Sequence, residues 1–139
     1  MHLQRTVWTV ICVAALFTFS VAAPAAEEPE AVYAKFHNAG LTSNFDEMRR
    51  YGTAAKGVEL AAMPAADRQS MFKFLAMILP KTYTVASKTL SPDGNRATMR
   101  VTSTQKSGTG GKPDTASGLI TLVKEKGLWK VDEADWGAN

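Results

Sequence analysis

Cysteine is almost absent from this sequence, and histidine is nearly as scarce. The 139 residues contain one cysteine, Cys12, and two histidines, of which only His37 lies beyond the first few residues. Cys12 stands inside an apolar run near the N-terminus, without the small residues that a lipid-acceptor cysteine needs just before the mature chain. Without that run, the chain has no thiol. Disulfide bonds, thiolate catalysis and cysteine-ligated metals are then excluded together.

The sequence also lacks a strong excess of one charge. It has 16 lysine and arginine residues against 13 acidic ones, a formal net charge of +3. The charge falls to +2 without Arg5, because 15 basic residues then remain. A nucleic-acid-binding protein gathers its basic residues on one face. Here they are scattered, and Arg49 and Arg50 are the only adjacent pair, so nucleic acid is not an expected partner.

The one long apolar run lies at the N-terminus. It extends from Val7 to Ala23, follows the basic residue Arg5 and ends in small residues up to Ala25. This order of charge, apolar core and small-residue cleavage site is typical of a secretory signal peptide. A run of about 17 residues is also near the lower limit for a membrane-spanning anchor, but no basic stop follows it. We therefore predict a signal peptide over residues 1–25 and a periplasmic or secreted bacterial protein without a membrane anchor.

Residues 26–139 have the length of one ordinary domain, which can bury somewhat over 60% of its unfolded surface and needs no disulfides. Apolar residues in the first half of this domain recur at helical spacing, and those in the second half alternate as in strands. The predicted helices cover residues 29–40, a short segment that begins at residues 43–46, and residues 64–79. Residues 53–63 are predicted as a connection with about one turn of helix.

The third predicted helix is the most apolar one, so it must be largely buried or lie beside a pocket. The strands are predicted near residues 83–87, 97–102, 119–123 and 128–131, with 119–123 apolar on both faces. A turn at residues 91–95, a hairpin loop at residues 106–114 and a tight turn at Lys126 and Gly127 join them. Three helices followed by four antiparallel strands give an α+β fold.

Two stretches of the strand half, GNRATMRV and LITLVKEKGLWKVDEADW, carry a resemblance to known proteins. Together with the helix-turn-helix phrase from Ala31 to Tyr51, they resemble the cystatin-like, nuclear-transport-factor-like cone fold, in particular small exported bacterial proteins. The resemblance implies N-terminal helices packed on a curved four-stranded antiparallel sheet, forming a cone. The open end of such a cone can hold a ligand, be filled by side chains or pair with a second copy of the chain. It implies a fold more firmly than a function.

The leading functional hypothesis is a non-catalytic module that binds an apolar small molecule or a partner protein in the cone mouth. The predicted lining residues are Phe74, Met77, Met99 and Trp129, because methionine adapts to varied shapes and aromatic rings bury large areas. Trp129 is expected above all to fill the core.

Two alternatives remain open. Enzymes of the resembling fold, such as ketosteroid isomerases and dehydratases, hold Asp, His or Tyr in an apolar cone, which points to Tyr33, His37 and Asp132 as catalytic candidates. The other alternative is an inhibitor or immunity partner of an exported toxin, which would use the strand face and the loop at residues 106–114. No metal or cofactor is expected, because the acidic residues near Asp132 are typical of a solvated strand edge.

Overall fold

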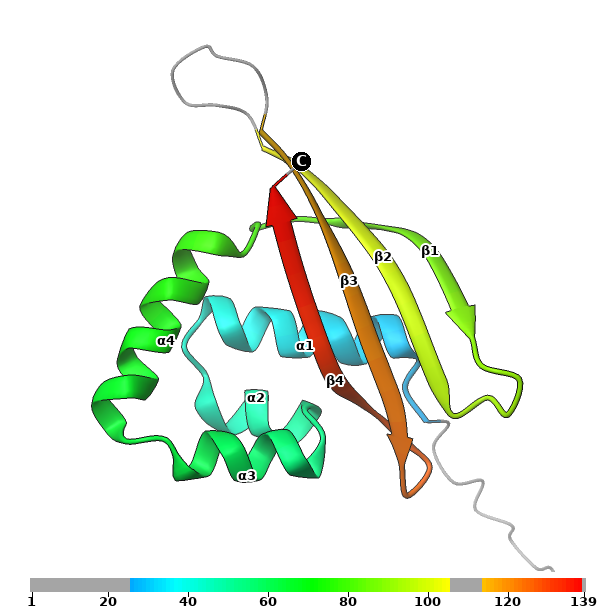
Figure 1. The fold of residues 1–139 in the computed structure, drawn as a ribbon, viewed down its shortest axis with the longest axis horizontal. Helices are drawn as coiled ribbons and strands as arrows, with labels where there is room; N and C mark the ends of the chain where they lie inside the picture. The colour runs from blue at the N-terminus through cyan, green and yellow to red at the C-terminus, as the bar shows by residue number, and fades with distance from the viewer. Residues whose placement is uncertain (1–25, 106–113, 139) are drawn as a thin grey trace, which may run out of the picture.

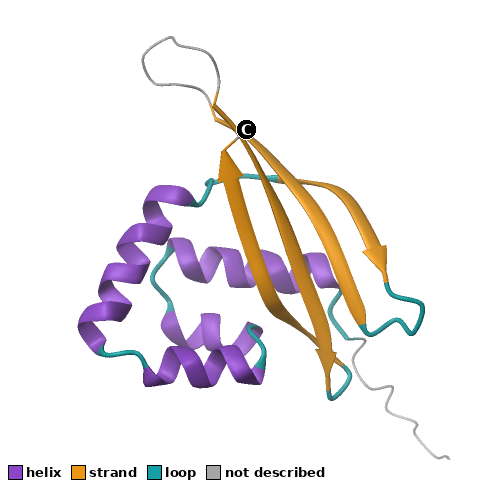
Figure 2. Cartoon of the chain, viewed as in Figure 1, coloured by secondary structure: helices purple, strands orange, loops and turns teal. Residues whose placement is uncertain are grey.

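A computed structural model of the protein describes residues 26–105 and 114–138. It contains the helices α1 (Pro29–Leu41), α2 (Phe45–Tyr51), α3 (Ala54–Ala62) and α4 (Ala65–Ile78), followed by the strands β1 (Thr84–Leu90), β2 (Arg96–Gln105), β3 (Asp114–Glu125) and β4 (Leu128–Ala138). Helix α1 crosses one face of the sheet, and α2, α3 and α4 gather beside β4 (Figure 1 and Figure 2). The signal peptide and most of the hairpin loop lie outside the described residues and stay predictions.

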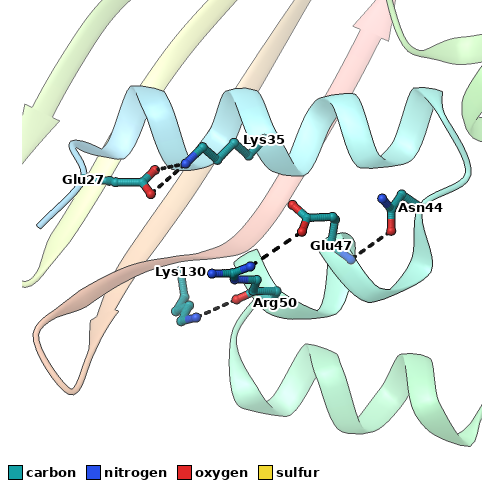
Figure 3. Close-up of polar contacts among 6 residues, drawn as sticks. All are labelled: Glu27, Lys35, Asn44, Glu47, Arg50 and Lys130. Carbon is teal, nitrogen blue, oxygen red and sulfur yellow. Dashed lines mark hydrogen bonds and ion pairs between the residues drawn. The ribbon is translucent and has the colours of Figure 1, made fainter.

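Hydrogen bonds at their first turns explain why α2 and α3 form as separate helices. The side chain of Asn44 accepts a hydrogen bond from the backbone N–H of Glu47 (3.2 Å), as Figure 3 shows, and Thr53 accepts one from Lys56 (3.2 Å). The sequence predicted a connection with about one turn of helix where the nine-residue helix α3 lies. Alanine, the strongest helix former, supplies four of its nine residues, and Leu60 anchors the helix in the core.

The sheet is an antiparallel meander in the order β1, β2, β3, β4. Its inner face supplies fully buried residues, and the alternation predicted for β2 is confirmed at Ala97, Met99 and Val101. The prediction that residues 119–123 of β3 are apolar on both faces, as in a central strand, holds only in part, because Thr121 on the outer face is buried but Leu119 on that face is not. Ile120 is fully buried, but the neighbouring Leu119 is 46% exposed, because alternate residues of a strand point to opposite faces and α1 crosses only one of them.

A β-bulge in β4 changes which residues of that strand face the helices. Thr121 pairs with Glu133, but the next residue, Leu122, pairs with Val131, which leaves Asp132 as the extra residue. Before the bulge, odd-numbered residues such as Trp129 are buried. After it, the even-numbered Trp136 packs against the same core cluster. The bulge therefore lets both tryptophans contact α1 from a single strand.

The predicted turn between β3 and β4 is confirmed. Lys126 and Gly127 both have positive φ values, 51° and 77°, as a two-residue hairpin turn requires. Trp129 is only 7% exposed and belongs to the same core cluster as Val32 and Val131, so the expectation that it fills the core is confirmed. The predicted α+β fold, helices packed on a curved four-stranded antiparallel sheet in the cone-like arrangement, is confirmed as well.

Gly118 is the small residue that lets Trp136 lie close to β3. It pairs directly with Trp136, and a Cβ placed on it would lie 2.8 Å from a methyl carbon of Val101 and 3.0 Å from the indole. We expect Gly118→Ala to lower the free energy of unfolding by about 1 to 3 kcal/mol, through overpacking of this contact. Urea unfolding measures the change.

Gly137 provides the matched control, because a Cβ on it would meet nothing within 4 Å. Gly137→Ala is expected to leave the urea midpoint nearly unchanged. Equal urea midpoints for both variants would show that a methyl group at position 118 is accommodated without overpacking.

Candidate functional site

Helix α1 and two other parts of the fold, the connection between α4 and β1 and the strand β4, meet at a chain of buried and part-buried hydrogen bonds. Tyr33 and His37 lie one turn apart on α1, and the Tyr33 hydroxyl is 3.1 Å from Nδ1 of His37. Nε2 of His37 is 2.8 Å from the carbonyl oxygen of Pro80, which lies between α4 and β1. Nε1 of Trp136, on β4, is 2.8 Å from the Tyr33 hydroxyl. The chain therefore runs from Trp136 through Tyr33 and His37 to Pro80.

The partners at the two ends determine where every proton of this chain lies. The carbonyl of Pro80 can only accept, so Nε2 of His37 carries the proton and donates it. In the neutral ring Nδ1 is then an acceptor, and the Tyr33 hydroxyl donates to it. Indole N–H only donates, so Trp136 donates to the Tyr33 oxygen. Every N–H and O–H of this chain is therefore already donated to a protein partner. The second lone pair of the Tyr33 oxygen is free to accept a hydrogen bond.

Burial determines the electrostatics of this group. Tyr33 is 1% exposed and His37 is 4% exposed. Burial raises the pKa of Tyr33 and lowers the pKa of His37, because an apolar environment disfavours the charged form of each. Tyr83 adds a third ring, with its centroid 5.4 Å from Tyr33 and 4.9 Å from His37, and its pKa is raised by burial too. At neutral pH the cluster is uncharged.

A pocket of about 250 Å³ lies against this cluster, between the four helices and β4. Tyr33 and His37 form part of its lining, together with Ala134 of β4. Among the described residues, the charged ones that line it are Lys56, which is half-buried, and Glu59, which is exposed, both from α3. Most of the wall is apolar and includes Met48, Leu60, Met63, Met71, Leu75 and Leu79.

The four residues predicted to bind a ligand lie in different parts of the fold, and none of them lines this pocket. Phe74 and Met77 lie on the outer side of α4 and are 57% and 82% exposed. Met99 is fully buried in the core on the inner face of β2. Trp129 lines a smaller pocket near the start of β4. Helix α4 does lie beside a pocket, as predicted, but through its other side chains.

Of the three catalytic candidates, the structure brings Tyr33 and His37 together and leaves Asp132 apart. Asp132 is the bulge residue of β4 and does not line the pocket. Its carboxylate lies 3.9 Å from the guanidinium of Arg96. The two members of the site that sequence reasoning missed are Trp136 and the Pro80 carbonyl. Alternation along β4 could not reveal Trp136, because the bulge reverses it.

Across 26–105 and 114–138, no group of three or more histidine and acidic side chains is placed to hold a metal ion. None of the helices α1 to α4 is long and apolar enough to cross a membrane.

No protein-family model and no curated protein matches the sequence. Among solved structures, a candidate dehydratase of the NTF2-like family from Streptomyces avermitilis matches with a TM-score of 0.47 and 12% identity, over 79% of this chain and 93% of that one. A candidate calcium/calmodulin dependent protein kinase II association domain from Xanthomonas campestris matches with a TM-score of 0.46 and 18% identity, over 85% and 92%. Both scores are below 0.5, so the cone-like fold described above rests on the topology of the chain itself.

The neutral state of His37 predicts that stability depends on pH. Its pKa is lowered from about 6.5 in the folded protein. Below pH 6.5 the unfolded chain therefore binds a proton that the folded chain does not, and the free energy of unfolding falls with falling pH. The fall is up to about 1.4 kcal/mol per pH unit and levels off below the folded-state pKa.

Urea unfolding of residues 26–139 between pH 7.5 and pH 5.5 measures this effect, with His37→Gln as the control. The variant should be less stable at every pH, because it disturbs the hydrogen-bond chain, but its stability should change much less across this window. A variant that loses stability with the same slope as the original chain would show that His37 is not the titrating group.

Proposed function

We propose that this protein is an exported, non-catalytic binding protein that holds a small apolar molecule in the pocket between its four helices and β4. The observation that carries the proposal is the pocket itself, about 250 Å³ with a wall of leucine and methionine side chains. This volume is slightly below the range of about 300 to 1,000 Å³ typical of drug-sized ligands, so the molecule is small. The predicted signal peptide supports the exported destination.

The methionine side chains in the wall favour a binding role. They allow the pocket to accept ligands of somewhat different shapes. Met48, Met63 and Met71 come from three different parts of the helical layer and converge on the same space. Methionine has three rotatable side-chain bonds and a polarizable sulfur, so it adapts to irregular apolar surfaces. Burial of the ligand's apolar surface against them supplies the affinity.

The polar end of the pocket favours binding over catalysis. An oxyanion-stabilising phenol needs a proton to donate, but the proton of Tyr33 is donated to His37. A general base needs a free lone pair, but Nδ1 of His37 accepts that same proton and Nε2–H is held by Pro80. Asp132 lies outside the pocket. The enzyme hypothesis would require this whole chain to rearrange.

The same chain indicates which polar group a ligand can carry. The free lone pair of the Tyr33 oxygen can accept a hydrogen bond, whereas no spare donor is present in the chain from Trp136 to Pro80. A ligand hydroxyl can donate to that oxygen. A carboxylate, which only accepts, would find no donor in this hydrogen-bond chain and could pair only with Lys56 of α3. An apolar molecule with one hydroxyl group is the ligand class that this pocket fits best.

A charge introduced into the wall tests the proposal. 1-Octanol is an apolar chain with one hydroxyl group, and its binding to residues 26–139 can be measured by calorimetry. Met71→Glu places a carboxylate in the pocket wall and is expected to weaken 1-octanol binding by about tenfold or more. Octanoate should bind more weakly than 1-octanol to the original chain.

Phe74→Glu is the matched control, because Phe74 is on the same helix but is 57% exposed and does not line the pocket. It should change the affinity by no more than about twofold. If Phe74→Glu weakens binding as much as Met71→Glu, the ligand also contacts the outer side of α4, where Phe74 lies, and the proposed pocket is wrong. If the original chain binds no 1-octanol, the proposal fails.

A further inference from the structure

A second, smaller pocket lies where α1, the end of α2 and the start of β4 meet. Its volume is about 240 Å³, and it shares no lining residue with the larger pocket. Its apolar part is formed by Val32, Tyr51, Leu128 and Trp129, and its charged part by Glu27, Arg50 and Lys130. The pocket therefore combines two aromatic rings with two cations.

The two rings have cations over them. The Nζ atom of Lys35 and the Cζ atom of Arg50 lie 5.3 Å and 5.6 Å from the centroid of the Tyr51 ring. The Nζ atom of Lys124 lies 5.0 Å from the centroid of the Trp129 ring. Each distance is within cation–π range. The two aromatic rings that line the pocket therefore have cationic side chains as direct neighbours.

The charges at this pocket do not cancel. Both carboxylate oxygens of Glu27 lie 2.7 Å from Nζ of Lys35, so its negative charge is already paired (Figure 3). Lys130 donates to the backbone carbonyl of Arg50 (2.6 Å), and both residues line the pocket. Among the described residues Lys130 forms no ion pair. Arg50 is 70% exposed and lies 3.8 Å from Glu47, a distance too long for a strong contact.

From this arrangement we infer that the smaller pocket binds a small aromatic carboxylate. The aromatic body packs against Tyr51 and Trp129, which supply apolar ring surface. The carboxylate pairs with Arg50, whose planar guanidinium presents two parallel N–H donors that match carboxylate oxygens, and with Lys130. The two pockets then select opposite polar groups: the larger one favours a hydroxyl donor and the smaller one an anion.

Phenylacetate binding to residues 26–139 tests this inference, with the neutral analogue phenylacetamide as the ligand control. Arg50→Gln is expected to weaken phenylacetate binding by about three- to fivefold, because Arg50 is 70% exposed and an exposed ion pair contributes little more than that. Arg49→Gln is the matched control, because it removes the same charge from the adjacent residue, whose guanidinium lies over Phe45 and which does not line the pocket. It should change the affinity by no more than about twofold.

Other results distinguish binding in the smaller pocket from non-specific attraction of the anion and from binding in the larger pocket. Equal losses in Arg50→Gln and Arg49→Gln would show that only overall charge attracts the anion, which overturns the inference. So would phenylacetamide binding as tightly as phenylacetate, or no phenylacetate binding at low salt. Met71→Glu should leave phenylacetate binding unchanged, and a loss there would place the ligand in the larger pocket instead. Unchanged urea midpoints for Arg50→Gln confirm that the variant is folded.

Discussion

The hydrogen-bond chain from Trp136 through Tyr33 and His37 to Pro80 holds the helices and the sheet together at one buried point. It joins the last strand, the first helix and the connection between α4 and β1 through three distances of 2.8 to 3.1 Å. Every one of its side chains is buried or half-buried, so loss of one partner would leave the others unsatisfied in an apolar environment, which is costly. The chain therefore aligns helices and sheet as a unit.

This hydrogen-bond chain also defines what the neighbouring pocket can do. Because the protons of Tyr33 and His37 are donated to protein partners, the polar end of the pocket is preorganised. Neither side chain is free to give a proton to a ligand or to take one from it. The remaining wall is supplied by helices whose apolar side chains do not fill the space between them. A binding protein needs such a rigid, mostly apolar site with few convergent polar groups. The smaller pocket at α2 and β4 complements it with cations and aromatic rings.

The sequence predicted the elements better than the site. Alternation identified Ala97, Met99 and Val101 as inward residues, and Gly127 identified the hairpin turn, because both signals are local. The pairing of Tyr33 with His37 followed from helical spacing. Trp136 could not be placed, since the bulge at Asp132 reverses the alternation of β4 and depends on pairing with a distant strand. The exposed Phe74 and Met77 were equally unpredictable, because spacing alone does not say how many faces of a helix are covered.

The tautomer of His37 decides between a binding pocket and a catalytic one, because it determines which ring nitrogen carries the proton. Nitrogen-15 NMR of the imidazole ring distinguishes a protonated Nε2 from a protonated Nδ1, and both from a charged ring. We expect a neutral ring at pH 7 with its proton on Nε2, hydrogen-bonded to Pro80. A ring with its proton on Nδ1, or a charged ring at that pH, would contradict this expectation.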